Sequence, residues 1–179
     1  EVGDLLHVVG TTQVLATIVD KPEPKVGRLV RPLGVGKKFV HVTHNPVGGA
    51  AVEWVRRLSF SDMPKEVFYG ATIDRALDHV TEVVFDPCYL AGDRLFFDRK
   101  TASFQNLTLS AKPLDLLTAV LVAMRSGHTK ALADVGIPHV KRLFLTGGGA
   151  DVVARLFENY GEAERLTEGS LFGIRRLFA

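Results

Sequence analysis

The sequence predicts an α/β domain built on one mixed sheet, and three observations support this prediction. Short runs rich in β-branched residues open the chain, segments with helical spacing of apolar residues then alternate with further apolar runs, and glycine-containing turns follow three of the strands. The opening strands need antiparallel pairing, whereas later crossovers through helices give parallel neighbours. We therefore expect a mixed sheet with three leading strands and flanking helices.

Size and composition limit the classes of protein to consider. The 179 residues fit a single domain, residues 1–179, and 46% hydrophobic with 23% charged residues excludes a disordered chain. A net charge of +2, from 22 basic and 20 acidic residues, does not favour a nucleic-acid partner. The lone Cys88 excludes an internal disulfide, and no apolar stretch is long enough to span a membrane. These features favour the cytoplasm and no membrane partner.

The first half of the chain predicts a hairpin, a third strand and a helix. Residues 5–9 and 14–19 read as two strands joined by a tight polar turn. Residues 20–38 hold three prolines, three glycines and six basic residues, so we expect a solvated, irregular connection there. Residues 39–43 form the third strand, and a glycine turn then leads to a helix within residues 47–58.

The middle of the chain is less regular. Apolar residues at helical spacing predict a helix over residues 71–82, and a short strand follows at residues 83–85. Residues 87–110 are rich in loop signals and predict no regular element.

The last part of the chain repeats the order of helix, strand, glycines and helix. A long helix is expected to begin near Pro113, a residue suited to a first helical turn, and to end at Ser126 and Gly127. Residues 142–146 read as a buried strand, and a helix is expected over residues 150–160 after three consecutive glycines.

Glycine turns at residues 10–12, 48–49 and 147–149 are the first candidates for chemistry. Glycine lets the backbone approach a ligand closely, and N–H groups at a turn or helix start can bind phosphate oxygens. Each turn taken singly is explained by turn geometry alone, but three together favour phosphate binding. Neither the P-loop pattern nor the dinucleotide-binding glycine pattern is present.

Two other groups of side chains are weaker candidates for metal sites. His41 and His44 lie three apart at a strand end, where ordinary strand histidines are the favoured interpretation. Asp86, Asp93 and Asp98 share one loop and offer oxygen ligands for Mg²⁺, although solvated loop carboxylates are the favoured interpretation.

Five motifs, in this order, resemble the C-terminal domain of FGGY-type carbohydrate kinases, the family of xylulokinases and glycerol kinases. The resemblance spans residues 1 to about 160, and its most distinctive segment reads Pro-Cys-Tyr-Leu-Ala-Gly-Asp-Arg. The motifs lie at residues 10–12, 48–54, 87–94, 107–110 and 146–150.

The resemblance implies a ribonuclease H-like fold of the actin-like ATPase superfamily. It implies an ATP-dependent kinase that transfers the γ-phosphate to a sugar or polyol hydroxyl, with Mg²⁺ as cofactor. This chain would be the nucleotide-binding half, inactive alone, and the N-terminal sugar-binding domain would lie outside it. The implied partners are ATP, a small carbohydrate and that missing domain, and a homodimer stays open.

The resemblance also assigns residues to the nucleotide. The β- and γ-phosphates would face the hairpin turn, the helix after the second turn would run along the nucleotide, and the third turn would flank the adenosine. The residues so assigned are Gly10, Thr11 and Thr12, then Gly49 and Glu53, and finally Gly148, Gly149 and Ala150. The general-base Asp is expected upstream of Glu1, no metal ligand is assigned, and Asp4 is expected in a surface turn.

Two other readings stay open at this point. The first is a non-catalytic actin-like binding or assembly module derived from a sugar kinase, which the apolar Val152 and Val153 after the third turn favour. The second is an α/β scaffold whose glycines serve only turns, which would hold if the three turns did not converge.

Overall fold

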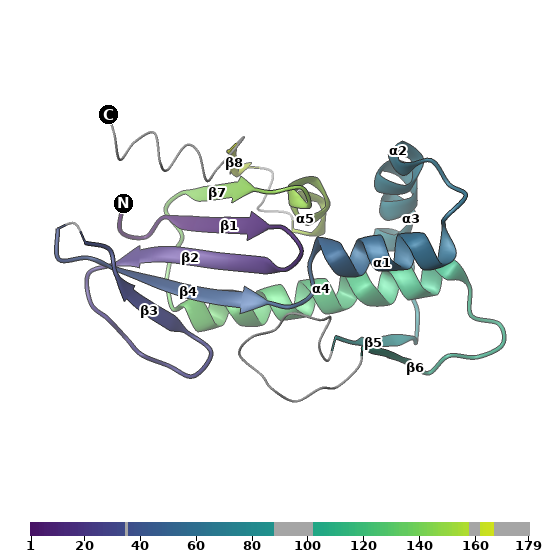
Figure 1. Cartoon of the computed structure of the whole chain (residues 1–179), viewed down its shortest axis with the longest axis horizontal. Coiled ribbons are helices and arrows are strands. Elements are labelled where there is room, and N and C mark those ends of the chain that lie inside the picture. Colours follow the sequence, from purple (N-terminus) through teal and green to yellow (C-terminus); the bar gives the residue numbers. More distant parts are fainter. Residues whose placement is uncertain (35, 88–101, 158–161, 167–179) are drawn as a thin grey trace.

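The computed structural model describes residues 1–34, 36–87, 102–157 and 162–166, and it is an α/β structure around a mixed sheet (Figure 1). The sheet has six strands in the order β3-β4-β2-β1-β7-β8, and a separate ribbon pairs β5 with β6. The strands of the sheet are β1 (Leu5–Val9), β2 (Gln13–Val19), β3 (Leu29–Pro32), β4 (Phe39–Asn45), β7 (Leu143–Thr146) and β8 (Glu164–Arg165). The mixed character predicted from the sequence is confirmed, because β1 pairs antiparallel with β2 and parallel with β7.

The opening hairpin forms as predicted. Residues of β1 alternate between buried and half-buried positions, and its partners run from Leu5 opposite Thr17 to Val9 opposite Gln13. This alternation is the period expected of a strand with one face in the core. The turn between the two strands comprises residues 10–12.

Four strands precede the first helix, so the expectation of three leading strands is wrong. The additional strand, β3, lies within the segment expected to be irregular and pairs only with β4. As an edge strand it is largely exposed, with Leu29 at 50% exposure, and it tolerates Pro32. Neither feature gives the alternating apolar pattern by which a strand is recognised.

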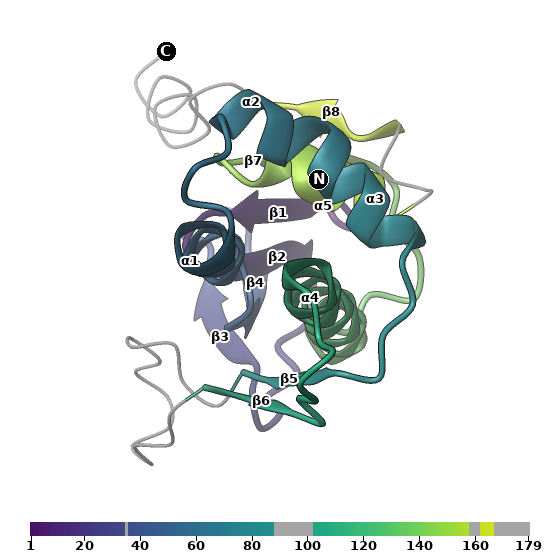
Figure 2. The same ribbon diagram turned by 90° about the vertical axis from the view of Figure 1, so that its right-hand side faces the viewer.

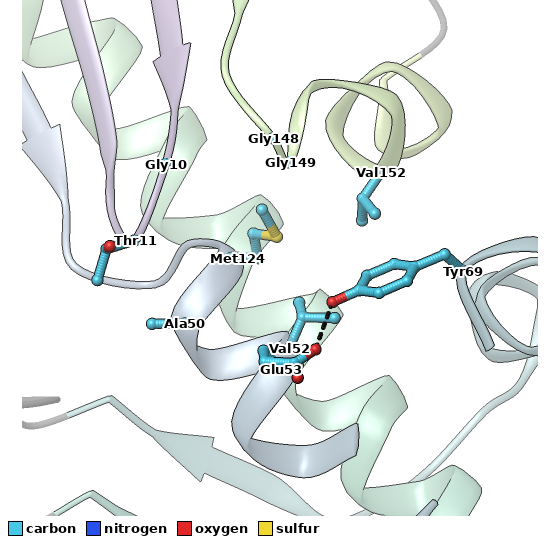
Figure 3. A pocket seen from close by; sticks show the side chains of 11 residues that line it. Gly10, Thr11, Ala50, Val52, Glu53, Tyr69, Met124, Gly148, Gly149 and Val152 are labelled. Carbon is cyan, nitrogen blue, oxygen red and sulfur yellow. Dashed lines mark hydrogen bonds between the residues drawn. The ribbon is translucent and has the colours of Figure 1, made fainter. Parts of the chain in front are cut away.

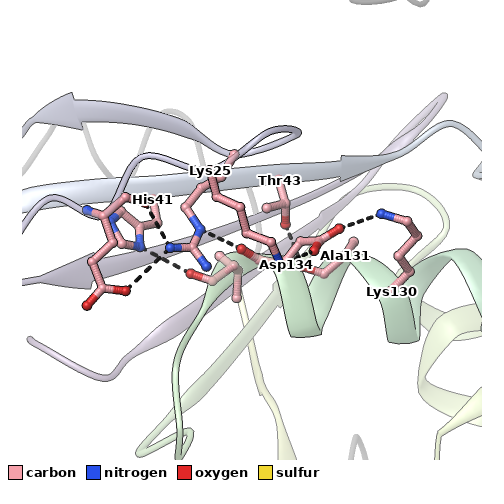
Figure 4. A network of polar contacts seen from close by, with 9 residues as sticks. Lys25, His41, Thr43, Lys130, Ala131 and Asp134 are labelled. Atoms are coloured by element: carbon pink, nitrogen blue, oxygen red, sulfur yellow. Dashed lines mark hydrogen bonds and ion pairs between the residues drawn. The ribbon is translucent and has the colours of Figure 1, made fainter.

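The basic segment before β3 is attached to the rest of the fold (Figure 4). Lys25 Nζ lies 2.8 Å from the Asp134 carboxylate, which Lys130 also contacts at 2.6 Å, and Arg28 donates to the Asp134 carbonyl. His41 of β4 lies 3.2 Å from the Val135 carbonyl. The expected solvated loop is therefore partly wrong, because two of its cations hold it against the end of a helix.

That helix, α4 (Pro113–Val135), packs on β4 and β2 and runs on beside α1 (Gly49–Ser59), as Figures 1 and 2 show. Its start at Pro113 confirms the prediction, but it continues through Gly127 and ends before Gly136, which has φ +77°. Gly127 serves packing here, since an added Cβ would lie 2.3 Å from the Asn45 side-chain oxygen.

The helix expected over residues 71–82 begins earlier and ends earlier. The chain forms α2 (Lys65–Val67), a π-helical segment η1 (Phe68–Thr72) and α3 (Ile73–Asp78), with a kink at Gly70. Val80, which completes the apolar pattern in the sequence, is 88% exposed. Because Val80 fits the apolar spacing, the predicted helix extends to residue 82, whereas α3 ends at Asp78.

The other elements are close to their expected positions. Helix α1 is confirmed, and α5 (Ala150–Leu156) confirms the start of the last helix, whose expected end falls beyond the described residues. The ribbon consists of β5 (Val84–Asp86), one residue later than predicted, and β6 (Ser103–Gln105), in a region where no strand was expected. None of the helices within the described ranges is long and apolar enough to cross a membrane.

Two buried histidines stack in the core between the sheet and α4. The rings of His7 on β1 and His128 on α4 have centroids 4.7 Å apart, and Phe157 packs on His128 at 4.3 Å. Burial, together with the charge His128 would carry, lowers the pKa of His7 to about 3, and burial lowers the pKa of His128 to about 4. Both imidazoles are therefore neutral near pH 7.

Candidate functional site

The three glycine turns meet at one pocket of about 300 Å³ (Figure 3). They come from distant parts of the chain and lie at the ends of β1, β4 and β7. The pocket is lined by Gly10, Thr11, Gly49, Ala50, Val52, Glu53, Tyr69, Met124, Gly148, Gly149 and Val152. Six of the eight residues assigned from the sequence are among them, whereas Thr12 and Ala150 adjoin the pocket without lining it. If the glycines served only turn geometry, the three turns could lie far apart, but residues of all three line this one pocket.

Backbone hydrogen bonds hold the turns together. The Gly49 N–H donates to the Gly10 carbonyl at 2.8 Å, and the next amide, of Ala50, donates to Thr11 at 3.2 Å. On the other side, the Gly149 N–H donates to the Val9 carbonyl at 3.0 Å. The hairpin turn is thus the centre of the assembly, with one helix start bonded to each side of it.

Two glycines are required by how closely these turns approach. A Cβ on Gly48 would lie 2.6 Å from the Thr12 Cα. Gly147 has φ +100°, a region that favours glycine, and a Cβ there would lie 2.3 Å from the Val9 carbonyl oxygen. Gly10 and Gly148, by contrast, face open space. Gly49 and Gly149 do both, because they line the pocket and a Cβ on them would lie 2.8 Å from the Gly10 carbonyl oxygen and 2.6 Å from Val9 Cγ1.

Most of the glycine amides already have acceptors within the protein. Besides the contacts between turns, the Gly10 N–H donates to Thr12 at 2.9 Å and the Ala150 N–H to Gly147 at 3.1 Å. The sequence favoured these amides as phosphate donors, and in this structure they hold the turns instead. Within the described residues, the amides of Thr11, Thr12 and Gly148 and both threonine hydroxyls have no hydrogen-bond partner. One end of the pocket therefore offers donors.

The other end of the pocket offers an acceptor. Glu53 accepts two hydrogen bonds from Arg56, both at 2.8 Å, and one from the Tyr69 hydroxyl at 2.7 Å. The Arg56 hydrogen bonds, and that of Tyr69, lower the pKa of Glu53 to about 2. Burial and the Glu53 carboxylate raise the pKa of Tyr69 to about 12, so its hydroxyl remains a donor. This end therefore presents a carboxylate already paired with Arg56, which can accept hydrogen bonds but cannot donate the hydrogen bonds that phosphate needs.

Sequence reasoning missed five of the lining residues. Ala50 and Val52 lie within four residues of Gly49 and Glu53 on α1, so the spacing of the helix could have indicated them. In the sequence, Val152 is an apolar residue where a polar one would suit a nucleotide, and this gave no reason to place it in the lining. Met124 and Tyr69 carried no signal. Tyr69 lies directly before the kink at Gly70, which no local pattern announced.

Several other expected positions differ from the structure or fall outside it. Asp4 is 7% exposed and pairs with Arg142, which lowers its pKa, so the expected surface turn is wrong. It precedes β1 at the end opposite Gly10. Residues 88–94 of the most distinctive motif, with Asp93 and Asp98, lie outside the described residues. Across the part of the chain that is described, no three His, Cys, Asp or Glu side chains gather as a metal site.

A second pocket, of about 600 Å³, lies between the end of β4, β5 and α4. It is lined chiefly by apolar residues, including Val83, Phe85 and Ala123, and none of the three glycine turns borders it. Its larger volume is not matched by a convergence of hydrogen-bond donors, so the pocket between the turns is the better candidate.

Comparison with known proteins gives no sequence family but a clear fold. No family model matches the chain, and no curated protein matches it. Among solved structures, a gluconate kinase from Lactobacillus acidophilus matches 86% of the chain with a TM-score of 0.67 and 23% identity. A ligand-bound xylulose kinase from the same organism matches 82% with a TM-score of 0.65 and 22% identity. A Plasmodium falciparum glycerol kinase determined with ADP matches 87% with a TM-score of 0.62 and 19% identity.

In each case the match covers only about a third of the other protein, at 32%, 31% and 33% respectively. Identities this low establish a shared fold and no more. The chain therefore has the fold of about a third of these gluconate, xylulose and glycerol kinases.

Proposed function

We propose that this chain is the ATP-binding half of a carbohydrate kinase, which transfers the γ-phosphate of ATP to a sugar or polyol hydroxyl. The observation that supports the proposal most is the meeting of three glycine turns at one pocket, where threonine donors at one end have no hydrogen-bond partner among the described residues. The fold shared with gluconate, xylulose and glycerol kinases, one of them determined with ADP, agrees with it.

The donors and acceptors of the pocket fit a nucleotide in one orientation. Amide and hydroxyl donors at Thr11, Thr12 and Gly148 suit the anionic oxygens of a triphosphate. The ionised Glu53 accepts hydrogen bonds from hydroxyl groups and donates none, so it suits the ribose side of the nucleotide better than the phosphates. The triphosphate would then lie at the hairpin turn and the nucleoside between α1 and α5.

Mg²⁺ would be bound chiefly through the nucleotide. The described residues contain no cluster of three acidic or histidine side chains, and Mg²⁺ in phosphoryl-transfer sites is commonly held by one or two carboxylates with phosphates and water. Such an ion would neutralise charge on the phosphates. We assign it no ligand in this chain.

Phosphoryl transfer depends mainly on positioning and charge stabilisation. In this proposal the chain positions the triphosphate through its hairpin turn, while the sugar pocket and the general base belong to the missing N-terminal domain. Asp4 is unsuited to the role of base, because it is ion-paired with Arg142 away from the pocket. The 179-residue chain alone should therefore bind MgATP without consuming it.

The variant Thr11→Val tests the phosphate contact directly. Loss of a hydrogen bond to a charged group costs about 1.5–3 kcal/mol, so we expect MgATP affinity to fall by about ten-fold or more. Thr129→Val is the matched control, because Thr129 is exposed on α4 and does not line the pocket, and we expect it to change affinity by less than about three-fold. Isothermal titration calorimetry measures both. Unchanged affinity in Thr11→Val would remove the hairpin turn from the site.

The non-catalytic module remains the second candidate, because of Val152. This apolar side chain borders the pocket in the first turn of α5, where a polar residue could hold the nucleotide. Sugar-dependent release of ADP by a longer parent chain that carries an upstream Asp would support the kinase. ATP binding without any such release would support the binding module.

A further inference from the structure

Tyr69 lines the pocket, yet the proposed function gives it no role. We propose that Tyr69 presents the aromatic face against which the nucleobase lies, and that Arg155 is a positioning residue for it. The inference rests on the proposed function, since it concerns the same pocket. It adds a specificity element: the site would select a nucleotide over a bare triphosphate through the face of one ring.

The position of Tyr69 fits a base-binding face. Its ring extends from η1 toward Glu53 of α1, across the opening from Val152 of α5 (Figure 3). Val52, Met124 and Val152 make the surrounding wall apolar. Among the described residues that line the pocket, Tyr69 is the only aromatic one. Nucleobases stack on such rings because their faces are apolar and polarizable.

The side chain of Tyr69 is anchored at both ends. Its hydroxyl donates to Glu53 at 2.7 Å, and Phe68 packs against its ring at 5.1 Å in a perpendicular arrangement. An anchored ring loses little conformational freedom when a base lies on it, so more of the stacking energy appears as affinity. The same hydrogen bond places the ring beside the carboxylate that suits the ribose.

The backbone of Tyr69 is held by Arg155. Gly70 departs from helical geometry, with φ −88° and ψ −108°, and π-helical irregularities of this kind are frequent at functional sites. Arg155 donates to the carbonyls of Tyr69 and Gly70, the latter at 3.3 Å, and pairs with Asp74 at 2.7 Å. The backbone at the kink thereby gains partners from another element.

Arg155 also connects the ring to the third glycine turn. It belongs to α5, the helix that begins at Ala150 directly after that turn. A shift of α5 would therefore move the carbonyl of Tyr69 as well as Gly149 and Val152. The two walls of the nucleoside side of the pocket are in this way fixed relative to each other.

The test compares the affinity of the 179-residue chain for MgATP with its affinity for magnesium triphosphate, the inorganic anion without a nucleoside. Aromatic stacking of a base contributes an affinity factor between about five-fold and a hundred-fold. Tyr69→Ala should lower the preference for ATP by such a factor and leave triphosphate affinity unchanged. Tyr69→Phe keeps the ring but loses the hydrogen bond to Glu53, so it should keep most of the preference. Phe60→Ala, which removes a ring packed on Phe68 outside the pocket lining, is the matched control.

The positioning role of Arg155 is tested by the ratio of MgATP affinity to magnesium triphosphate affinity, because a change in stability alone would not distinguish it from a structural role. Arg155→Met should lower the preference for ATP, whereas Arg75→Met, at an exposed position on α3, should not. If Arg155 acts through Tyr69, its replacement should have no further effect on the ratio in the Tyr69→Ala background. A purely structural role would lower both affinities together, in either background, and would overturn the positioning role.

The possible failures are distinguishable. If neither ATP nor triphosphate binds the wild-type chain, the proposed function fails. If both bind and Tyr69→Ala keeps the wild-type ratio, only the role of Tyr69 is overturned. Should Tyr69→Ala not fold, Tyr69→Leu replaces it, and 8-azido-ATP photolabelling of the wild-type chain should modify the peptide containing Tyr69. Labelling confined to other peptides would overturn the inference.

Discussion

Gly147→Ala is expected to lower the free energy of unfolding by about 3 kcal/mol or more. The residue has φ +100°, and its new Cβ would lie 2.3 Å from the Val9 carbonyl oxygen and 2.7 Å from the carbonyl carbon. Both contacts are to backbone, which cannot move aside as a side chain can. The end of β1 and the third turn would have to separate, and the hydrogen bond from Gly149 to Val9 would be lost with them.

The neighbouring Gly148→Ala is the matched control for this prediction. A Cβ on Gly148 meets nothing within 4 Å, so we expect stability within about 1 kcal/mol of the wild type. Urea unfolding followed by circular dichroism measures both variants. Equal destabilisation by the two replacements would mean that Gly147 and the end of β1 are not in close contact.

Acid is expected to destabilise the protein well before its carboxylates are protonated. The pKa of His7 is about 3 and that of His128 about 4 in the folded chain, against an ordinary value of 6.5. Between these values the unfolded chain binds protons that the folded chain does not, so stability is complete above about pH 6.5 and falls as the pH decreases. Each histidine contributes a slope of up to about 1.4 kcal/mol per pH unit.

The variant His128→Phe isolates this effect. A phenyl ring can keep the stacking with His7 and Phe157 but cannot be protonated, so we expect the slope of stability against pH to fall by about half. Urea unfolding between about pH 5 and 7 avoids the range in which carboxylates such as Glu53 take up protons. Thr129→Val, at an exposed position on α4, is the control and should keep the wild-type slope. A wild-type stability that does not change over this range would contradict the buried neutral pair.

The sequence was informative where one face of an element is buried. The alternation in β1 and β2 and the proline at the start of α4 identified these elements, because burial and helix initiation leave local patterns. β3 was missed, since an edge strand with exposed Leu29 needs no alternation. In the sequence Gly127 predicts a helix end, whereas α4 continues through it. A glycine is needed there because the Asn45 side chain, from a distant segment, packs against it.

The candidate site shows the same division. Glycines after strands drew attention to the three turns, and the order of motifs suggested that they face one ligand. Which amides hold the turns and which remain as donors could not be inferred, because Gly49 bonds to Gly10 and Gly149 to Val9 only once the fold is complete. Tyr69 could not be inferred for a similar reason, since its hydrogen bond to Glu53 joins two separate helical segments, η1 and α1.

Titration of the ¹⁵N-labelled chain with MgATP, followed by amide chemical shifts, tests the phosphate site most directly. The amides that have no partner in the described part of the chain predict the largest shifts at Thr11, Thr12 and Gly148, with smaller shifts along the start of α1. Shifts confined to the apolar pocket between β4 and α4, or no shifts at all, would contradict a triphosphate held where the three turns meet.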